Sequence, residues 1–324
     1  MQYQRLGGSG LRVSRISLGS WLTIGNAVEQ AASDALVRHA VDRGINLLDT
    51  ADVYNDGEGE LALGRAIKGL RRDRLVIASK CYFPMSDDPN DCGLSRKHIV
   101  QSIEASLQRL GLDYLDLYQC HRPDPDTPIE ETAMAMDDLI RQGKTLYWGV
   151  SYWPARLIVQ AVQFCRAHSF HAPVSNQPPY SLLRRDLEDE VMDAAWECGV
   201  GQIVFSPLAQ GVLTGKYRPG AAPPKESRAA DDRANRFIGA YLTEENVARV
   251  ESLRDIAAQA GVTPAQLALA WCLRRPEVNS VIVGARTTAQ LDDNLGALEV
   301  GLGPDVQAAL DRAFPGATPR DTAT

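Results

Sequence analysis

Residues 95–119 read SRKHIVQSIEASLQRLGLDYLDLYQ and contain the two kinds of element from which the whole chain is built. The apolar residues of Ile99–Leu110 recur every three or four positions, as in a helix with one buried face, and Gly111 ends the run. The run Tyr114–Gln119 that follows predicts a short strand. A helix followed by a buried strand is the unit of an α/β protein.

The same unit recurs along the chain. Short apolar runs predict eight strands, at Ser14–Leu18, Ile45–Asp49, Leu75–Ser79, Tyr114–Gln119, Leu146–Val150, Val174–Gln177, Ile203–Ser206 and Ser280–Gly284. Stretches of helical period predict eight helices, at residues 30–43, 58–69, 95–109, 130–142, 154–168, 186–198, 264–274 and 287–296. Strands joined by helices run parallel, and eight right-handed units close without leaving an edge. We therefore predict a single (β/α)8 TIM barrel rather than an open doubly wound sheet, which usually has fewer strands.

Three segments lie outside this alternation. Residues 1–13 predict an N-terminal β-hairpin that caps the bottom of the barrel. Residues 215–242, rich in Pro, Gly, Ala and Arg, predict a lid or a binding loop. Residues 314–324 predict a frayed tail, so that the barrel domain would occupy residues 1–313.

Composition excludes several classes of protein. The chain has 324 residues, of which 44% are hydrophobic and 23% charged, as in a globular protein with a large core. A net charge of −7 argues against nucleic-acid and anionic-membrane partners. No apolar run approaches the roughly 18 residues of a membrane span, and the N-terminus lacks the apolar core of a signal peptide. Six scattered cysteines without a C-x-x-C pair favour reduced thiols, a cytoplasmic location and no metal site.

Four titratable residues follow three successive predicted strands. Asp49 ends the second strand and Tyr54 comes five residues later, while Lys80 follows the third strand and His121 the fourth. Each has an ordinary explanation by itself, as a turn residue, a packing residue or a strand end that meets water. Because the C-terminal ends of barrel strands share one rim, we expect the four side chains to lie together in an active site.

These residue types suit the reduction of a carbonyl group. Hydride arriving at a carbonyl carbon leaves an alkoxide, which must be stabilised or protonated. Tyr54 can supply the proton, although a free phenol has a pKa of about 10 and releases its proton poorly. The ammonium of Lys80 would lower that pKa by favouring the phenolate, and Asp49 would hold Lys80 in place. Neutral His121 would orient the substrate oxygen. Trp21, Tyr82, Phe83 and Trp153 could add an aromatic wall, although core or rim packing explains these four rings nearly as well.

Five motifs carry a family resemblance. They are NLLDTADVY at residues 46–54, IASK at 77–80, HRPD at 121–124, FSPLAQG at 205–211, and GAR at 284–286 followed by Gln290, Asp293 and Asn294. With this set the sequence resembles the aldo-keto reductase superfamily over nearly its full length. The runs GLSRKHI at 93–99 and TPIEET at 127–132 are most similar to the branch of voltage-gated potassium channel β-subunits and their plant and bacterial relatives.

The resemblance implies an NADPH-dependent reductase of aldehydes and ketones, with Asp49, Tyr54, Lys80 and His121 as its catalytic tetrad. It implies substrate contacts from Trp21, Tyr54 and His121, to which the aromatic wall would add Tyr82. It implies cofactor contacts from Ser20, Trp21, Asp49, Ser151, Gln177, Ser206, Pro207, Leu208, Gln210, Lys216, Arg228, Gly284, Arg286, Gln290, Asp293 and Asn294. Independently of the family, Arg286 precedes a predicted helix, and a cation beside a helix N-terminus favours the 2′-phosphate of NADPH over NADH.

The sequence departs from the family pattern at several positions. Asp293 stands where Glu is usual, Tyr152 where Asn or Arg is usual, and Ala27 where channel β-subunits carry Gln. His121 matches ordinary reductases, whereas animal channel subunits carry Asn there, which favours an enzyme over the alternative of a regulatory or redox-sensing NADPH-binding protein.

Other questions stay open at this stage. A barrel lyase or isomerase that forms a Schiff base on Lys80 is a second alternative. The resemblance allows small or aromatic aldehydes, α-dicarbonyls or triose phosphates as substrate, and either a homo-oligomer or a monomer.

Overall fold

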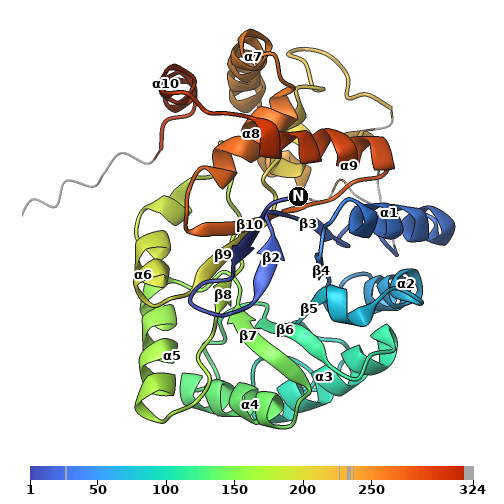
Figure 1. Ribbon diagram of the computed structural model, residues 1–324, viewed down its shortest axis with the longest axis vertical. Helices are drawn as coiled ribbons and strands as arrows, with labels where there is room; N and C mark the ends of the chain where they lie inside the picture. The colour runs from blue at the N-terminus through green and yellow to red at the C-terminus, as the bar shows by residue number, and fades with distance from the viewer. Residues whose placement is uncertain (26–27, 226, 232–234, 236, 317–324) are drawn as a thin grey trace, which may run out of the picture.

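Eight parallel strands form a closed barrel in the computed structural model, which describes the chain apart from residues 26–27, 226, 232–234, 236 and 317–324 (Figure 1). In ring order the strands are β3 (Ile16–Gly19), β4 (Leu47–Asp49), β5 (Val76–Cys81), β6 (Leu115–Cys120), β7 (Thr145–Val150), β8 (Ser175–Asn176), β9 (Gly201–Val204) and β10 (Val278–Val283). The ring closes because β10 pairs with both β9 and β3. The predicted (β/α)8 barrel is therefore confirmed.

The helices surround this ring in chain order (Figure 1). They are α1 (Gln30–Asp42), α2 (Glu58–Ile67), α3 (Arg96–Leu110), α4 (Ile129–Arg141), α5 (Ala155–Ala167), α6 (Val191–Glu197), α7 (Glu244–Gln259), α8 (Pro264–Leu273), α9 (Thr288–Leu295) and α10 (Pro304–Ala313). Two of them, α7 and α10, are additions to the predicted set, and they pack against each other beside α8.

Helix α3 illustrates how the sequence sets these boundaries. Ser95 caps its N-terminus by accepting a hydrogen bond from the backbone N–H of His98 at 3.2 Å. Gly111 ends it in the left-handed conformation, at φ +66°, which glycine adopts without steric cost. Between these caps, Ile99, Ile103 and their neighbours at helical spacing are buried against the barrel.

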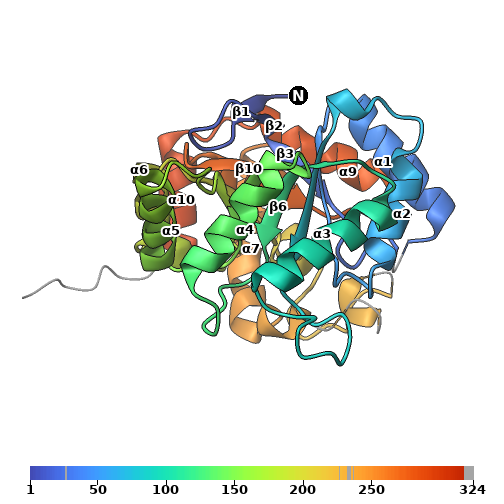
Figure 2. The same ribbon diagram turned by 90° about the horizontal axis from the view of Figure 1, so that it is seen from below.

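The N-terminal hairpin closes the bottom of the barrel, as predicted. Its strands are β1 (Tyr3–Arg5) and β2 (Arg12–Ser14), and Leu6 and Val13 are fully buried against the barrel interior. Asn279 at the base of β10 donates to the carbonyl of Arg5 at 2.9 Å. Figure 2 shows the hairpin at one end of the barrel and α7 toward the other, so the opposite rim is the end open to ligands.

The predicted helix and strand ends lie within two residues of the observed ones, except for the start of one helix, and the boundary of the tail also needs correction. The helix expected over residues 186–198 begins only at Val191, because Asp186–Glu188 forms a separate 3-10 turn in which the Glu188 carboxylate accepts from Tyr180 and Arg185. Residue 314, where the frayed tail was expected to begin, belongs to the folded barrel domain. Phe314 is fully buried and its carbonyl accepts from Arg185 at 2.8 Å. Residues 317–324 of that predicted tail lie outside the described residues.

No single helix in the described part of the chain is long and apolar enough to cross a membrane. Helices α7 and α8 together reach the length and apolar composition of a membrane span, but the chain bends by 91° between them. Most of α8 is buried inside the protein.

Candidate active site

A cavity of about 1050 Å³ opens at the C-terminal ends of the strands. Asp49 at the end of β4, Tyr54 in the loop after it, and His121 after β6 all line this cavity. Lys80 on β5 lies behind them and is fully buried. The four residues predicted from the strand ends therefore meet in one place.

Lys80 lies at the centre of this cluster. Its ammonium donates to Asp49 Oδ1 at 2.7 Å and to the carbonyl oxygen of Thr50 at 2.7 Å. It also donates to the Tyr54 hydroxyl at 3.3 Å. The second oxygen of Asp49 accepts from Gln177 Nε2 at 2.8 Å, so both carboxylate oxygens are satisfied. Burial by itself lowers the pKa of Lys80, but the Asp49 carboxylate and the hydrogen bonds to Asp49 and Tyr54 outweigh burial and the pKa is raised. Lys80 therefore stays an ammonium ion at neutral pH.

Tyr54 reaches Lys80 because the chain turns sharply after it. Asn55, Asp56 and Gly57 all have left-handed backbone, with φ of +51°, +53° and +90°. A Cβ atom on Gly59 would lie 3.0 Å from the Cβ atom of Tyr54. Glycine at position 59 therefore lets the start of α2 pack closely against the tyrosine.

The protonation state of Tyr54 differs from the expectation based on Lys80 alone. Burial raises the pKa of the phenol, and the nearby Lys80 ammonium opposes this without cancelling it. The net pKa of Tyr54 is raised, although part of the side chain faces the cavity. The phenol therefore keeps its proton at neutral pH, as a proton donor must, while Lys80 lies ready to stabilise the phenolate that donation leaves.

His121 is neutral. Burial lowers the pKa of its imidazole well below the usual value, and the charges of Lys80 and Arg122 lower it further. Its ring meets the Tyr54 ring edge-on at 5.6 Å between centroids and the Phe83 ring at 5.0 Å. A neutral imidazole carries one N–H, which can donate to a substrate oxygen.

A buried polar network lies behind the Lys80 strand. Glu60 on α2 accepts from Ser79 Oγ at 2.5 Å and from Arg109 Nε at 2.7 Å. Asp52 accepts from Ser102 Oγ at 3.0 Å, and its own backbone N–H donates to the carbonyl of Lys80 at 3.2 Å. Burial and the charge of Glu60 raise the pKa of Asp52 to about 7, despite the opposing hydrogen bonds and the charge of Arg109.

Replacing Asp52 by asparagine is expected to change how stability depends on pH. Since the folded pKa of Asp52 lies above its unfolded value of 3.8, its stabilising contribution is present at low pH and is lost as pH rises to about 7. Between about pH 5 and pH 8 the wild type should lose roughly 3 kcal/mol more unfolding free energy than Asp52→Asn. Urea unfolding at the two pH values measures this, with the exposed Asp73→Asn as control. Equal pH dependence in wild type and Asp52→Asn would show that Asp52 is already ionised at pH 5.

The predicted cofactor residues gather in the same cavity. All of them line it except Ser20, whose hydroxyl donates to Thr50 Oγ1 at 2.9 Å just beneath. Ser151 Oγ donates to the carbonyl of Gln177 at 2.7 Å, which fixes the end of β7 against the end of β8. Asp293 lines the cavity and accepts from Gln266 Nε2 at 2.9 Å.

The structure describes one of two further departures from the family pattern, Tyr152, and does not describe the other, Ala27. The ring of Tyr152 packs against Phe205 at 5.9 Å between centroids. Ala27 is among the residues outside the described part of the chain.

Three cations meet at one end of the cavity. Lys216, Arg228 and Arg286 all line it, and burial together with the two arginine charges lowers the pKa of Lys216. Arg286 pairs with Asp231 at 2.5 Å, and Arg228 donates to the side chain of Gln210. Like charges brought together in a buried cavity favour an anionic ligand between them.

The loop after β9 adds backbone strain at the same end of the cavity. Ser206, Ala209 and Gln210 have positive φ of +53°, +47° and +59°, a conformation that residues other than glycine rarely adopt. Backbone strain of this kind is concentrated at ligand-binding sites. This loop carries the FSPLAQG motif that the sequence singled out.

The substrate end of the cavity is aromatic. Trp21 packs against Phe237 at 5.0 Å and against Tyr54 at 6.2 Å between ring centroids. Of the predicted substrate residues, Trp21, Tyr54 and His121 line the cavity. Tyr82 is not among the lining residues; its ring packs edge-on against Phe83, which lines the cavity in its place.

Phe83, which the sequence offered as part of the aromatic wall, lines the cavity, and so do Arg122 and Phe237, to which sequence reasoning assigned no role. Arg122 could have been found, since it stands next to His121 in the HRPD motif. Phe237 lies within a long loop without periodicity, and no sequence signal indicates where its ring lies. Phe237 and Arg228 do bring the predicted binding loop, residues 215–242, to the cavity.

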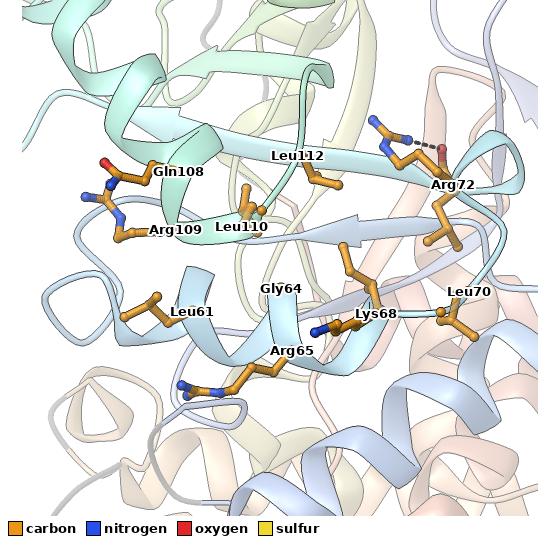
Figure 3. Close-up of a pocket in the computed structure, with 14 residues that line it drawn as sticks. Leu61, Gly64, Arg65, Lys68, Leu70, Arg72, Gln108, Arg109, Leu110 and Leu112 are labelled. Carbon is orange, nitrogen blue, oxygen red and sulfur yellow. Dashed lines mark hydrogen bonds between the residues drawn. The ribbon is translucent and has the colours of Figure 1, made fainter.

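A second pocket, of about 510 Å³, lies on the outer wall between α2 and α3 (Figure 3). It sits where these helices end and the chain enters β5 and β6, at the opposite end of the strands from the rim. Arg72 and Arg109 line it, but they already pair with Asp116 and Glu60, each at 2.7 Å. Packing and ion pairs account for this pocket without a ligand.

Among the described residues, no three His, Cys, Asp or Glu side chains gather in a way that could hold a metal ion. Cys81 and Cys120, which neighbour Lys80 and His121, are fully buried, and burial raises the pKa of both thiols. Burial and a raised pKa favour packing over redox chemistry for these two cysteines.

Comparison with known proteins extends over almost the whole chain. The model of the Aldo/keto reductase family matches residues 15–314. A protein of Arabidopsis thaliana named "Probable voltage-gated potassium channel subunit beta" is 42% identical over 303 residues, which cover 93% of this chain and 92% of that protein. A protein of the same name from Oryza sativa subsp. japonica gives the same figures. A Schizosaccharomyces pombe relative with a name of the same kind is 41% identical over 319 residues, covering 95% of this chain and 92% of its own length.

Proposed function

Because this chain belongs to the aldo/keto reductase family and is therefore an oxidoreductase, we propose that it reduces aldehydes and ketones to alcohols with NADPH. The single observation that carries the proposal is the contact of the Lys80 ammonium with both the Asp49 carboxylate and the Tyr54 hydroxyl. A protonated phenol held beside a buried cation is suited to donate a proton at neutral pH.

Each residue of the cluster has a distinct part in the proposed reaction. The carbonyl oxygen of the substrate lies between Tyr54 and His121, and the His121 N–H orients it. NADPH, when bound, supplies the hydride to the carbonyl carbon. As negative charge develops on the oxygen, Tyr54 transfers its proton to it, and Lys80 stabilises the phenolate that remains. Asp49 keeps Lys80 charged and in position.

The residues present fit an extended dinucleotide. Asp49, Ser151 and Gln177 lie beside the proposed hydride-transfer site, and the cation cluster of Lys216, Arg228 and Arg286 lies at the other end of the same cavity. A group of cations suits the pyrophosphate and the 2′-phosphate, and the latter is present only in NADPH. The N-terminus of α9 directly follows Arg286 and adds a favourable dipole for an anion.

Replacing Arg286 by alanine is expected to weaken NADPH binding about 10–100-fold, because one charge-assisted hydrogen bond to phosphate is lost. NADH binding should change much less, since NADH lacks the 2′-phosphate. Fluorescence titration of both cofactors measures the two dissociation constants. Arg218→Ala is the matched control, since Arg218 is exposed and pairs with Glu251. If the substitution weakened the binding of NADPH and NADH equally, Arg286 would not be the residue that recognises the 2′-phosphate.

The proposed activity is tested by following NADPH consumption with a panel of neutral aldehydes and identifying the alcohol product. We expect multiple turnovers, one alcohol for each NADPH consumed. The absence of turnover on every aldehyde, with NADPH bound tightly, would overturn the proposal in favour of the second candidate.

The second candidate is a regulatory or redox-sensing subunit that binds NADPH, and the names of the three plant and yeast relatives favour it. Such a protein would keep its cofactor for long periods and turn over slowly. The neutral His121 beside Tyr54 supports the enzyme instead, because a donor to the carbonyl oxygen is present.

The location, partners and oligomeric state of the enzyme belong to the same proposal. We propose a cytoplasmic enzyme whose partner is a small carbonyl compound rather than a nucleic acid or a membrane. A monomer and a homo-oligomer both fit this proposal, and sedimentation distinguishes them.

A further inference from the structure

We propose that Arg122 binds an anionic group of the substrate, so that the enzyme selects aldehydes or ketones that also carry a carboxylate or a phosphate. This inference rests on the proposed reductase function and names the substrate class of the same site. It starts from the position of Arg122 directly after His121, at the end of β6, where its side chain lines the cavity.

The guanidinium group is held in place by three neighbours. Its Nη1 donates to the backbone carbonyl of His121 at 2.6 Å. Its central carbon lies 4.6 Å from the centroid of the Tyr152 ring and 5.4 Å from that of the Phe83 ring. A guanidinium group fixed against two aromatic rings presents its remaining N–H groups in one direction, with little conformational freedom left to lose on binding.

Arg122 lacks a carboxylate partner among the residues that the structure describes. After burial, the largest influences on its pKa come from Tyr152, Tyr54, Tyr82 and Arg184, and none of these is a carboxylate. The nearest acid along the sequence, Asp124, is engaged by the backbone N–H of Leu94 and the hydroxyl of Thr127, each at 2.7 Å.

Arg184 shows the contrast. It contacts the same Tyr152 ring, with its guanidinium carbon 5.2 Å from the centroid, but it pairs with Asp186 at 3.1 Å. It is also absent from the lining of the cavity.

An unpaired cation in a cavity is costly unless a ligand neutralises it. Burial lowers the pKa of Arg122, which reports that its charge is incompletely hydrated. The planar fork of an arginine matches carboxylate and phosphate oxygens, with two parallel hydrogen bonds. The rest of this end of the cavity is apolar and aromatic, with Trp21, Phe83 and Phe237 in its lining. The matching substrate has an anionic group joined to its carbonyl through a compact apolar body.

The test compares substrates that differ in charge alone. 4-Carboxybenzaldehyde and its neutral amide, 4-formylbenzamide, have nearly the same shape. The wild type should show a kcat/KM about 10–100-fold higher for the acid, the range of a charge-assisted pair of hydrogen bonds. A second pair, 4-formylphenyl phosphate and the neutral 4-methoxybenzaldehyde, gives the corresponding ratio for phosphate, and comparing the two ratios tells whether phosphate or carboxylate is the better match. A wild type that reduces acid and amide equally well would overturn the proposal.

Variants identify the residue responsible. In Arg122→Gln the ratio of kcat/KM for acid over amide should fall to about one, and in Arg122→Lys, which keeps the charge but loses the fork, it should be intermediate. Arg184→Gln should keep the wild-type ratio. A purely structural role of Arg122, through the His121 carbonyl, would lower both rates together and leave the ratio unchanged; that result would also overturn the proposal.

A binding measurement separates this inference from the proposed function. Calorimetric titration of the acid and the amide into the NADP⁺-loaded protein reports the charge preference without chemistry. Binding that depends on Arg122, without turnover of either compound, would sustain the anion site and overturn the reductase. Turnover of both compounds with equal binding would sustain the reductase and overturn the anion site.

Discussion

The Tyr54→Phe enzyme is expected to reduce aldehydes at least about 100-fold more slowly than the wild type, which is the scale of a general-acid contribution. The substitution removes one hydroxyl and leaves the ring in contact with Trp21 and His121. Without that hydroxyl, the alkoxide that forms from the substrate has no proton donor backed by Lys80. The loss should appear in kcat, because the proton moves in the transition state and contributes little to ground-state binding.

Steady-state kinetics with NADPH and one well-behaved aldehyde measure this effect, together with the dissociation constant of NADPH, which should change little. Tyr3→Phe is the control, since the Tyr3 hydroxyl donates to the Gly44 carbonyl at the hairpin end of the barrel. Full turnover by Tyr54→Phe would mean that another group delivers the proton, and the mechanism proposed above would be abandoned.

Replacing Lys80 by methionine is expected to abolish measurable turnover and to destabilise the fold. The substitution leaves the Asp49 carboxylate buried, with Gln177 as its remaining side-chain donor in the described structure. Breaking a buried ion pair by removing one partner costs about 3–5 kcal/mol of unfolding free energy. Denaturant unfolding should therefore show a clear fall in stability, whereas Lys68→Met, at an exposed position directly after α2, should show almost none.

A double variant separates the two consequences of losing Lys80. In Lys80→Met combined with Asp49→Leu, no unpaired charge is left behind, and part of the lost stability should return. Turnover should not return, because the cation that stabilises the Tyr54 phenolate is still missing. Recovery of activity along with stability would show that Lys80 acts only through folding.

Both the barrel and the active-site cluster could be predicted because parallel strands are buried along their length and end together at one rim. Strands β4 and β5 are buried and read mainly as apolar runs, and a polar residue such as Asp49 or Lys80 marks where each run approaches the rim. Since parallel strands bring these ends together, the meeting of Asp49, Tyr54, Lys80 and His121 follows from topology alone. Their distances do not follow from it, because they depend on the turn after Tyr54.

Helix α7, the position of Phe237 and the pKa of Tyr54 could not be predicted, because they depend on loop paths and on the extent of burial. Helix α7 has a narrow apolar stripe among many charges, so its periodicity was missed beside the long insertion, although Thr243 supplies an N-cap signal. The place of Phe237 in the cavity depends on the path of that insertion. The effect of Lys80 on the pKa of Tyr54 had the predicted sign, but the size of the opposing burial effect requires the three-dimensional structure.

The pairing of β10 with β3 joins segments near the two ends of the chain. During synthesis β3 leaves the ribosome early, whereas its partner β10 leaves only when almost all of the chain has been made. Throughout that interval one side of β3 exposes unpaired amide and carbonyl groups, which can pair with another nascent chain. Of the strand pairs in the barrel, this one closes the longest stretch of chain and so carries the largest loop-closure entropy cost.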